Sequence, residues 1–153
     1  MLEVEKRIRS LGLELPESPK PVASYIPAVK TGSYVFTSGQ IPFVKGELKY
    51  RGKIGDNLTQ EEGYDCARVT VLNCLAAVKS VIGDLDRIKQ IVRVTGFINS
   101  APGFQDQPKV LNGASDLLVE IFGERGKHSR LALGTSELPL GAAMEIDLIV
   151  EIQ

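Results

Sequence analysis

The stretch MEIDLIVEIQ, residues 144–153, carries the clearest structural signal in the chain. Large apolar residues occupy every second position: Met144, Ile146, Leu148, Val150 and Ile152. The positions between them are mostly polar: Glu145, Asp147, Ile149, Glu151 and Gln153. Successive side chains of a β-strand point to opposite faces of the sheet. This period of two therefore predicts a strand with one buried face and one mostly polar face.

Four earlier segments also have the composition of strands. Residues 24–29 and 33–38 predict a hairpin around Lys30-Thr31-Gly32, and residues 88–99 form a run rich in β-branched side chains. Residues 130–136 predict the strand that precedes the last one. Between residues 45 and 55 the chain is polar and glycine-rich, which indicates a loop or a short hairpin.

Two longer segments predict helices. Thr59 and Glu62 have the spacing of a capping box, and apolar residues then recur every three or four positions up to Gly83. The second helix runs from about Gln107 to Phe122. The expected order is ββ-α-β-α-ββ. This order is typical of an α+β fold with a mixed sheet and two helices packed on one face.

The chain has 153 residues, a common size for a single domain. Residues 21–153 are expected to form that domain. Residues 1–20 precede it as a short amphipathic helix, with Val4, Ile8 and Leu11 on one side, followed by a Pro-rich linker. We expect this N-terminal segment to be dispensable for folding.

Charge and cysteine content restrict the class of protein. Lys and Arg total 18 and Asp and Glu total 19, so the basic excess typical of phosphate-binding proteins is missing and a nucleic-acid partner is not expected. Cys66 and Cys74 lie eight residues apart in one helix, which is too far for a disulfide. The N-terminal residues do not predict a signal peptide or a membrane span. We therefore expect a cytoplasmic protein with reduced thiols and no membrane association.

Arg130 is the first candidate for a functional role. Its expected strand face continues with Ala132, Gly134 and Ser136, and these small residues leave space beside a fixed guanidinium. A guanidinium binds a carboxylate through two parallel hydrogen bonds. The alternative is a solvated arginine at a strand edge.

Glu145 is the second candidate, because a glutamate on the polar face of the last strand could act as a general acid or base or orient a water. The alternative is an ordinary outward-facing glutamate. His128 is the only histidine and is predicted to lie in a loop, so we expect neither a catalytic triad nor a histidine-rich metal site. The sequence implies no metal and no cofactor.

Two motifs resemble those of the reactive intermediate deaminase (Rid, YjgF-like) family. The segment Thr37-Ser38-Gly39-Gln40-Ile41-Pro42 is similar to its TSGQ-P segment. Arg130, then Leu138-Pro139, then Met144-Glu145-Ile146-Asp147 is similar to its C-terminal signature. The resemblance covers roughly residues 21–153, so the chain resembles a divergent subgroup with an N-terminal helical extension. It implies a chorismate-mutase-like fold and a homotrimer with ligand clefts between subunits.

The resemblance also implies an activity and a set of site residues. Active members convert enamines and imines such as 2-aminoacrylate to 2-keto acids and ammonia without a cofactor. Arg130 matches the arginine that binds the substrate carboxylate, and Glu145 matches the glutamate that positions water. Tyr25 and Ser38 match residues that line the cleft, and Asn112 falls near a further substrate-binding asparagine.

Two alternative functions are compatible with the same residues. The same pocket could hold a small carboxylate without turnover, as a regulatory trimer would. Some relatives carry names as endoribonucleases or translation inhibitors. The balanced charge and the single histidine argue against phosphodiester cleavage.

Overall fold

The computed structural model describes residues 3–18 and 24–153. Residues 19–23 of the predicted linker lie outside this description. The principal elements of the described chain are α1 (Glu3–Ser10), β1 (Ala28–Thr31), β2 (Tyr34–Thr37), α2 (Gln60–Ile82), β5 (Ile88–Asn99), α3 (Gln107–Phe122), β6 (Ser129–Thr135) and β7 (Met144–Ile152). Shorter elements connect them: the hairpin strands β3 (Phe43–Val44) and β4 (Glu47–Leu48), and the 3-10 helices η1 (Leu85–Arg87), η2 (Gly123–Gly126) and η3 (Pro139–Gly141).

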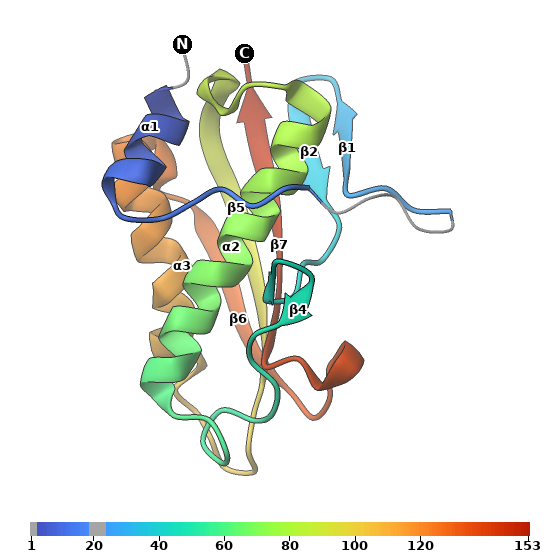
Figure 1. Cartoon of the computed structure of the whole chain (residues 1–153), viewed down its shortest axis with the longest axis vertical. Helices are drawn as coiled ribbons and strands as arrows, with labels where there is room; N and C mark the ends of the chain where they lie inside the picture. The colour runs from blue at the N-terminus through green and yellow to red at the C-terminus, as the bar shows by residue number, and fades with distance from the viewer. Residues whose placement is uncertain (1–2, 19–23) are drawn as a thin grey trace.

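The described strands form one five-stranded sheet in the order β1-β2-β7-β5-β6, with β3 and β4 paired separately. β5 and β6 run parallel, and the other neighbours in the large sheet are antiparallel. The long helices α2 and α3 lie side by side across one face of this sheet (Figure 1). This arrangement confirms the predicted α+β class with both helices on one side.

The register of β7, β5 and β6 determines which side chains share a face. Leu148 pairs with Val94, which pairs with Arg130, and the two apolar residues of this row are buried beneath the helices. The row three residues further along β5, which contains Phe97 and its partner Glu145, lies on the open face. Because alternate residues of a strand face opposite ways, Arg130 and Glu145 lie on opposite faces of the sheet.

The first hairpin differs from its prediction. β1 begins at Ala28, four residues later than expected, and the turn consists of Gly32 and Ser33 between the paired Thr31 and Tyr34. Gly32 has φ of 56°, which suits the first position of a tight hairpin turn. The residues before β1 are bound by Ser38 instead, whose backbone N–H donates to the Pro27 carbonyl at 2.8 Å.

The state of the two cysteines agrees with the prediction of reduced thiols. Cys66 and Cys74 are free thiols buried inside α2, and burial raises the pKa of the Cys66 thiol to about 12. A thiol with such a pKa is a core residue with low reactivity. None of the described helices is both long and apolar enough to cross a bilayer.

The helix α1 belongs to the core, so the expectation that the N-terminal segment is dispensable needs revision. Val4 is 3% exposed and Ile8 is fully buried, in the same apolar cluster as the sheet and long helices. The carboxylate of Asp86 accepts hydrogen bonds from the N–H groups of Glu3 and Val4, both at 2.8 Å. The side chain of Arg7 donates to the Glu120 carbonyl of α3 at 2.9 Å.

We therefore predict that truncation is destabilising. Ile8→Ala should lower the free energy of unfolding by about 2–5 kcal/mol, because it removes a fully buried side chain and leaves a cavity. Removing residues 1–20 should cost more than this single substitution. Urea unfolding of both proteins tests the prediction, with the exposed Arg9→Ala as a control that should change little. A truncated protein as stable as the full chain would restore the original expectation.

Candidate functional site

Arg130 is the second residue of the edge strand β6, and its side chain turns toward α3. Nη1 donates to Oδ1 of Asn112 at 2.9 Å and to Oγ of Ser115 at 3.2 Å, and Nη2 donates to the Pro108 carbonyl at 3.2 Å. The three partners are spaced by four and then three residues, so one face of α3 presents all of them. We call Arg130 and these three partners the arginine cluster. The helix thus fixes the orientation of the guanidinium.

The guanidinium retains capacity to bind a ligand. It has five N–H donors, and the bonds to the described residues use three of them. The N–H of Nε and one N–H of Nη2 have no partner among the described residues, and together they make one edge of the planar group. Two parallel donors of this kind match the two oxygens of a carboxylate.

Glu145 lies against a different part of the chain, on the open face of β7. A Cβ atom at Gly39 would stand 2.1 Å from Oε2 of Glu145, so a side chain at this position would displace the carboxylate from its place against the backbone. The adjacent Gln40 exchanges two backbone hydrogen bonds with Ile146, at 2.8 and 3.0 Å. These bonds hold the segment after β2 beside Glu145.

The predicted cleft residues Ser38 and Tyr25 belong to this second region. The Ser38 hydroxyl donates to the Ile26 carbonyl at 2.6 Å, so it ties the backbone next to Tyr25 to the residue before Gly39. The Tyr25 side chain is 59% exposed. We call Glu145, Gly39, Ser38 and Tyr25 the glutamate cluster.

The electrostatics of Glu145 suit a proton-transfer role. Partial burial raises the pKa of its carboxyl, and the nearby Asp147 on the same strand face raises it further. The pKa of Asp147 is also raised by burial, an effect that Arg93 and a hydrogen bond from Thr95 partly offset. A carboxyl with a raised pKa exchanges protons more readily near neutral pH than an ordinary glutamate does.

The structure thus divides the predicted site residues into two groups. Asn112 lies beside Arg130, and Ser38 lies next to the glycine that contacts Glu145. The two groups occupy opposite faces of the sheet, and β7 and β5 separate β2 from β6. Within one chain, Arg130 and Glu145 therefore do not converge on one small ligand.

The environment of His128 is not apparent from the sequence, which predicts no triad around this residue. The imidazole lies 2.8 Å from the Ser115 hydroxyl of the arginine cluster and 2.6 Å from the Gly126 carbonyl. The two residues are 13 positions apart: Ser115 lies in α3 and His128 in the loop before β6. Only the position of β6 against α3 brings them together, and neither periodicity nor spacing signals it.

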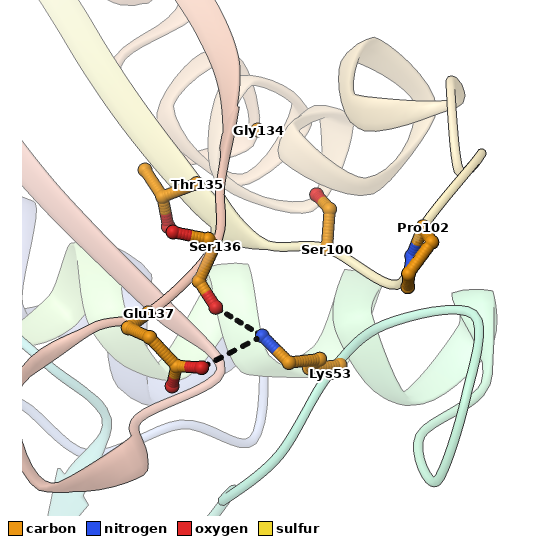
Figure 2. Close-up of a pocket in the computed structure, with 7 residues that line it drawn as sticks. All are labelled: Lys53, Ser100, Pro102, Gly134, Thr135, Ser136 and Glu137. Carbon is orange, nitrogen blue, oxygen red and sulfur yellow. Dashed lines mark hydrogen bonds and ion pairs between the residues drawn. The ribbon is translucent and has the colours of Figure 1, made fainter.

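A hollow of about 450 Å³ lies where β5 and β6 end (Figure 2). Its lining includes Lys53, whose Nζ lies 2.9 Å from Oδ1 of Asn99 and 3.5 Å from the Glu137 carboxylate, and also donates to the Ser136 carbonyl. An ammonium has three donors. These contacts use all of them, so Lys53 anchors the loop before α2 to the end of β6.

The described residues contain no cluster of three potential metal ligands. Across residues 3–18 and 24–153, no three His, Cys, Asp or Glu side chains gather in an arrangement that could hold a metal ion.

Comparisons with known proteins extend over nearly the whole chain. Residues 5–152 match the family model described as "YjgF/chorismate_mutase-like, putative endoribonuclease". The chain is 39% identical over 150 residues to Protein TCP17 of Trypanosoma cruzi, covering 97% of this chain and 94% of that protein. The family match begins inside α1, so the region shared with relatives includes the N-terminal helix.

Two further relatives carry functional names. The chain is 29% identical over 142 residues to the 2-iminobutanoate/2-iminopropanoate deaminase of Dermatophagoides farinae, covering 92% of this chain and 95% of that one. The crystal structure of a "putative endoribonuclease" from Shewanella oneidensis matches with a TM-score of 0.93 and 42% identity, over 97% of this chain and 99% of that one.

Proposed function

Because the chain belongs to the YjgF/chorismate-mutase-like family, we propose that it hydrolyses reactive enamines or imines that carry a carboxylate, giving 2-keto acids and ammonia. The relative from Dermatophagoides farinae is named for imine deamination, although it is only 29% identical. The observation that carries the proposal is the geometry of Arg130, whose guanidinium is fixed by α3 with one bidentate edge available.

In this proposal the arginine cluster binds the substrate carboxylate. The two free donors of Arg130 grip its oxygens, and the three bonds to α3 prevent the guanidinium from following the ligand. The reacting carbon, adjacent to the carboxylate, is then held in a fixed position. Holding reactants in place lowers the entropic part of the barrier.

Glu145 positions the attacking water in the proposed reaction. Its ionised carboxylate accepts a hydrogen bond from a water that attacks the carbon of the protonated imine, and takes up one proton as the C–O bond forms. Glu145 returns this proton to the nitrogen of the resulting carbinolamine. The C–N bond then breaks as ammonia leaves, and the hydroxyl group gives up its proton to become the carbonyl of the 2-keto acid. The raised pKa of Glu145 makes both proton transfers accessible.

We further propose that the two clusters meet across a subunit interface, in a homotrimer. The open face of the sheet supports this assembly, since several large apolar residues there are 40–50% exposed: Val29, Tyr34, Phe36, Leu131 and Leu133. Such a face requires a partner. A second copy of the chain can cover it and at the same time bring its glutamate cluster to the arginine cluster of its neighbour. A cytoplasmic location, with its reduced thiols, belongs to this proposal.

The test is an assay of purified protein with 2-aminoacrylate and a panel of imines derived from amino acids, combined with light scattering. We expect release of ammonia and 2-keto acid above the spontaneous rate, and a mass near three times the 16.6 kDa chain. An inactive protein that still binds 2-keto acids through Arg130 would indicate a regulatory binding protein instead. A stable monomer at micromolar concentration would remove the proposed cleft.

A further inference from the structure

The surface between α3 and the start of β6 contains a second hollow, of about 410 Å³. It is lined by Asn112, Ser115, Asp116, Val119, Lys127, His128 and Arg130. The imine deamination proposed above uses Arg130, with Asn112 and Ser115 only as groups that hold its guanidinium. That reaction gives the imidazole of His128 no role, and it does not use the Ser115 hydroxyl as a donor to His128.

The hydrogen bonds around His128 define its tautomer. The Gly126 carbonyl, 2.6 Å from Nδ1, can only accept, so Nδ1 carries the proton. In the neutral ring Nε2 is then an acceptor, and the Ser115 hydroxyl 2.8 Å away donates to it. The orientation of the ring is fixed by a backbone atom, as the base of a nucleophile–base pair requires.

Ser115 behaves unlike a structural serine within a helix. Such serines commonly donate to a carbonyl of the preceding turn, as Ser80 of α2 does to Ala77 at 2.6 Å. The Ser115 hydroxyl instead donates to a histidine and accepts from Nη1 of Arg130 at 3.2 Å. A guanidinium next to this oxygen favours its deprotonated form.

His128 is surrounded by groups that keep it neutral. Burial lowers the pKa of its imidazole, and the positive charge of Arg130 on β6 lowers it further, although the bond to Gly126 acts in the opposite direction. Of the other charged side chains that line the hollow, Asp116 of α3 accepts from the Tyr64 hydroxyl at 2.8 Å. Lys127 is paired with Glu124 at 2.9 Å.

We propose that Ser115 is an activated nucleophile and His128 its general base, and that the pair hydrolyses small esters with an anionic acyl group. Ser115 Oγ attacks the ester carbonyl carbon while its proton passes to Nε2 of His128. The bond to the leaving alcohol breaks, and the alcohol takes that proton. A water then gives a proton to Nε2 and adds to the acyl-serine, and the acid leaves as the proton returns to Oγ.

The cations of the hollow set the substrate class. Arg130 and Lys127 line the same space as the nucleophile, so they favour an acyl group with a carboxylate and stabilise the oxyanion of the tetrahedral intermediate. This activity needs neither Glu145 nor a second subunit. It therefore shares Arg130 with the proposed imine hydrolysis but differs from it in the reacting groups.

Covalent labelling tests the inference directly. The full-length protein is treated with a fluorophosphonate probe, and peptide mass spectrometry locates the label. We expect labelling at Ser115, its loss in Ser115→Ala, and a decrease in rate of at least about 100-fold in His128→Asn, which keeps a donor for the Gly126 carbonyl but lacks the base. Ser80→Ala is the matched control and should label like the wild type.

Two results would overturn the inference: no label at Ser115 in the folded protein, or an equal labelling rate in His128→Asn. Hydrolysis of 4-nitrophenyl hemisuccinate should follow the labelling through the same variants. Measuring imine deamination on the same samples separates the two proposals. Deamination without labelling would contradict only the ester hydrolysis, and labelling without deamination would contradict only the imine reaction.

Discussion

Arg130→Ala is expected to lower kcat/KM for imine deamination by about 30- to 1,000-fold, which corresponds to the loss of a charge-assisted bidentate contact. The substitution removes the only side chain of the arginine cluster that carries a charge. Arg130→Lys should also be poor, because an ammonium cannot reproduce the planar pair of donors or the bonds to Asn112 and Pro108. Steady-state kinetics with 2-aminoacrylate measures both effects.

Substitution of a second arginine, Arg125, serves as a control that distinguishes loss of the binding site from loss of structure. Arg125 donates to the Ile88 carbonyl at 2.7 Å and lies over the Phe122 ring, so it also connects elements near η2. Arg125→Ala should reduce thermal stability and leave kcat/KM within a few-fold of the wild type. If Arg130→Ala deaminates imines as well as the wild type does, Arg130 is not the carboxylate-binding residue.

The elements predicted most accurately are those specified by local sequence. The capping box at Thr59 and the glycine at position 83 bound α2 as expected, since capping depends on residues three or four apart. β7 was equally clear, because its alternation reflects one covered and one open face. The start of the first hairpin was predicted too early. The composition of residues 24–27 favours a strand, but in the structure hydrogen bonds from Ser38 to the carbonyls of residues 26 and 27 hold this segment outside β1.

The site was harder to predict, because it depends on register and packing. The sequence indicated Arg130 and Glu145 separately, but only the pairing of Val94 and Phe97 with their neighbours shows that they face opposite sides. The contact between Ser115 and His128 requires α3 to pack on β6, which no local pattern encodes. Likewise, the amphipathic pattern of residues 3–11 predicted a helix but not what it covers.

The second large effect is expected when subunits with different substitutions are mixed, because the proposed site combines clusters from two subunits. Arg130→Ala should be nearly inactive, and Glu145→Gln should be slower by about 100-fold or more, because the amide cannot accept a proton from water. If each site takes Arg130 from one subunit and Glu145 from another, the two variants complement each other. In randomly mixed trimers, each site has a chance of one half to receive a native Arg130 and a chance of one half to receive a native Glu145. Roughly one quarter of the sites therefore combine both native residues.

A second mixture provides the control. Wild-type protein mixed equally with the double variant Arg130→Ala/Glu145→Gln should also retain about one quarter of its sites when sites are shared between subunits. If each site lay within one chain, this mixture would retain about half, and the mixture of single variants would recover nothing. Comparing the activities of the two mixtures therefore shows whether each site is shared between subunits or lies within one chain, and no absolute rate is needed.

The most direct test of the account is thus the imine deaminase activity of co-refolded Arg130→Ala and Glu145→Gln subunits, purified as mixed trimers through two different affinity tags. Sites shared between subunits predict recovery of activity far above either parent, approaching about one third of the wild-type rate, because each trimer that contains both kinds of subunit has one native site in three. Activity no greater than the sum of the separate variants, in trimers shown to contain both kinds of subunit, would contradict it.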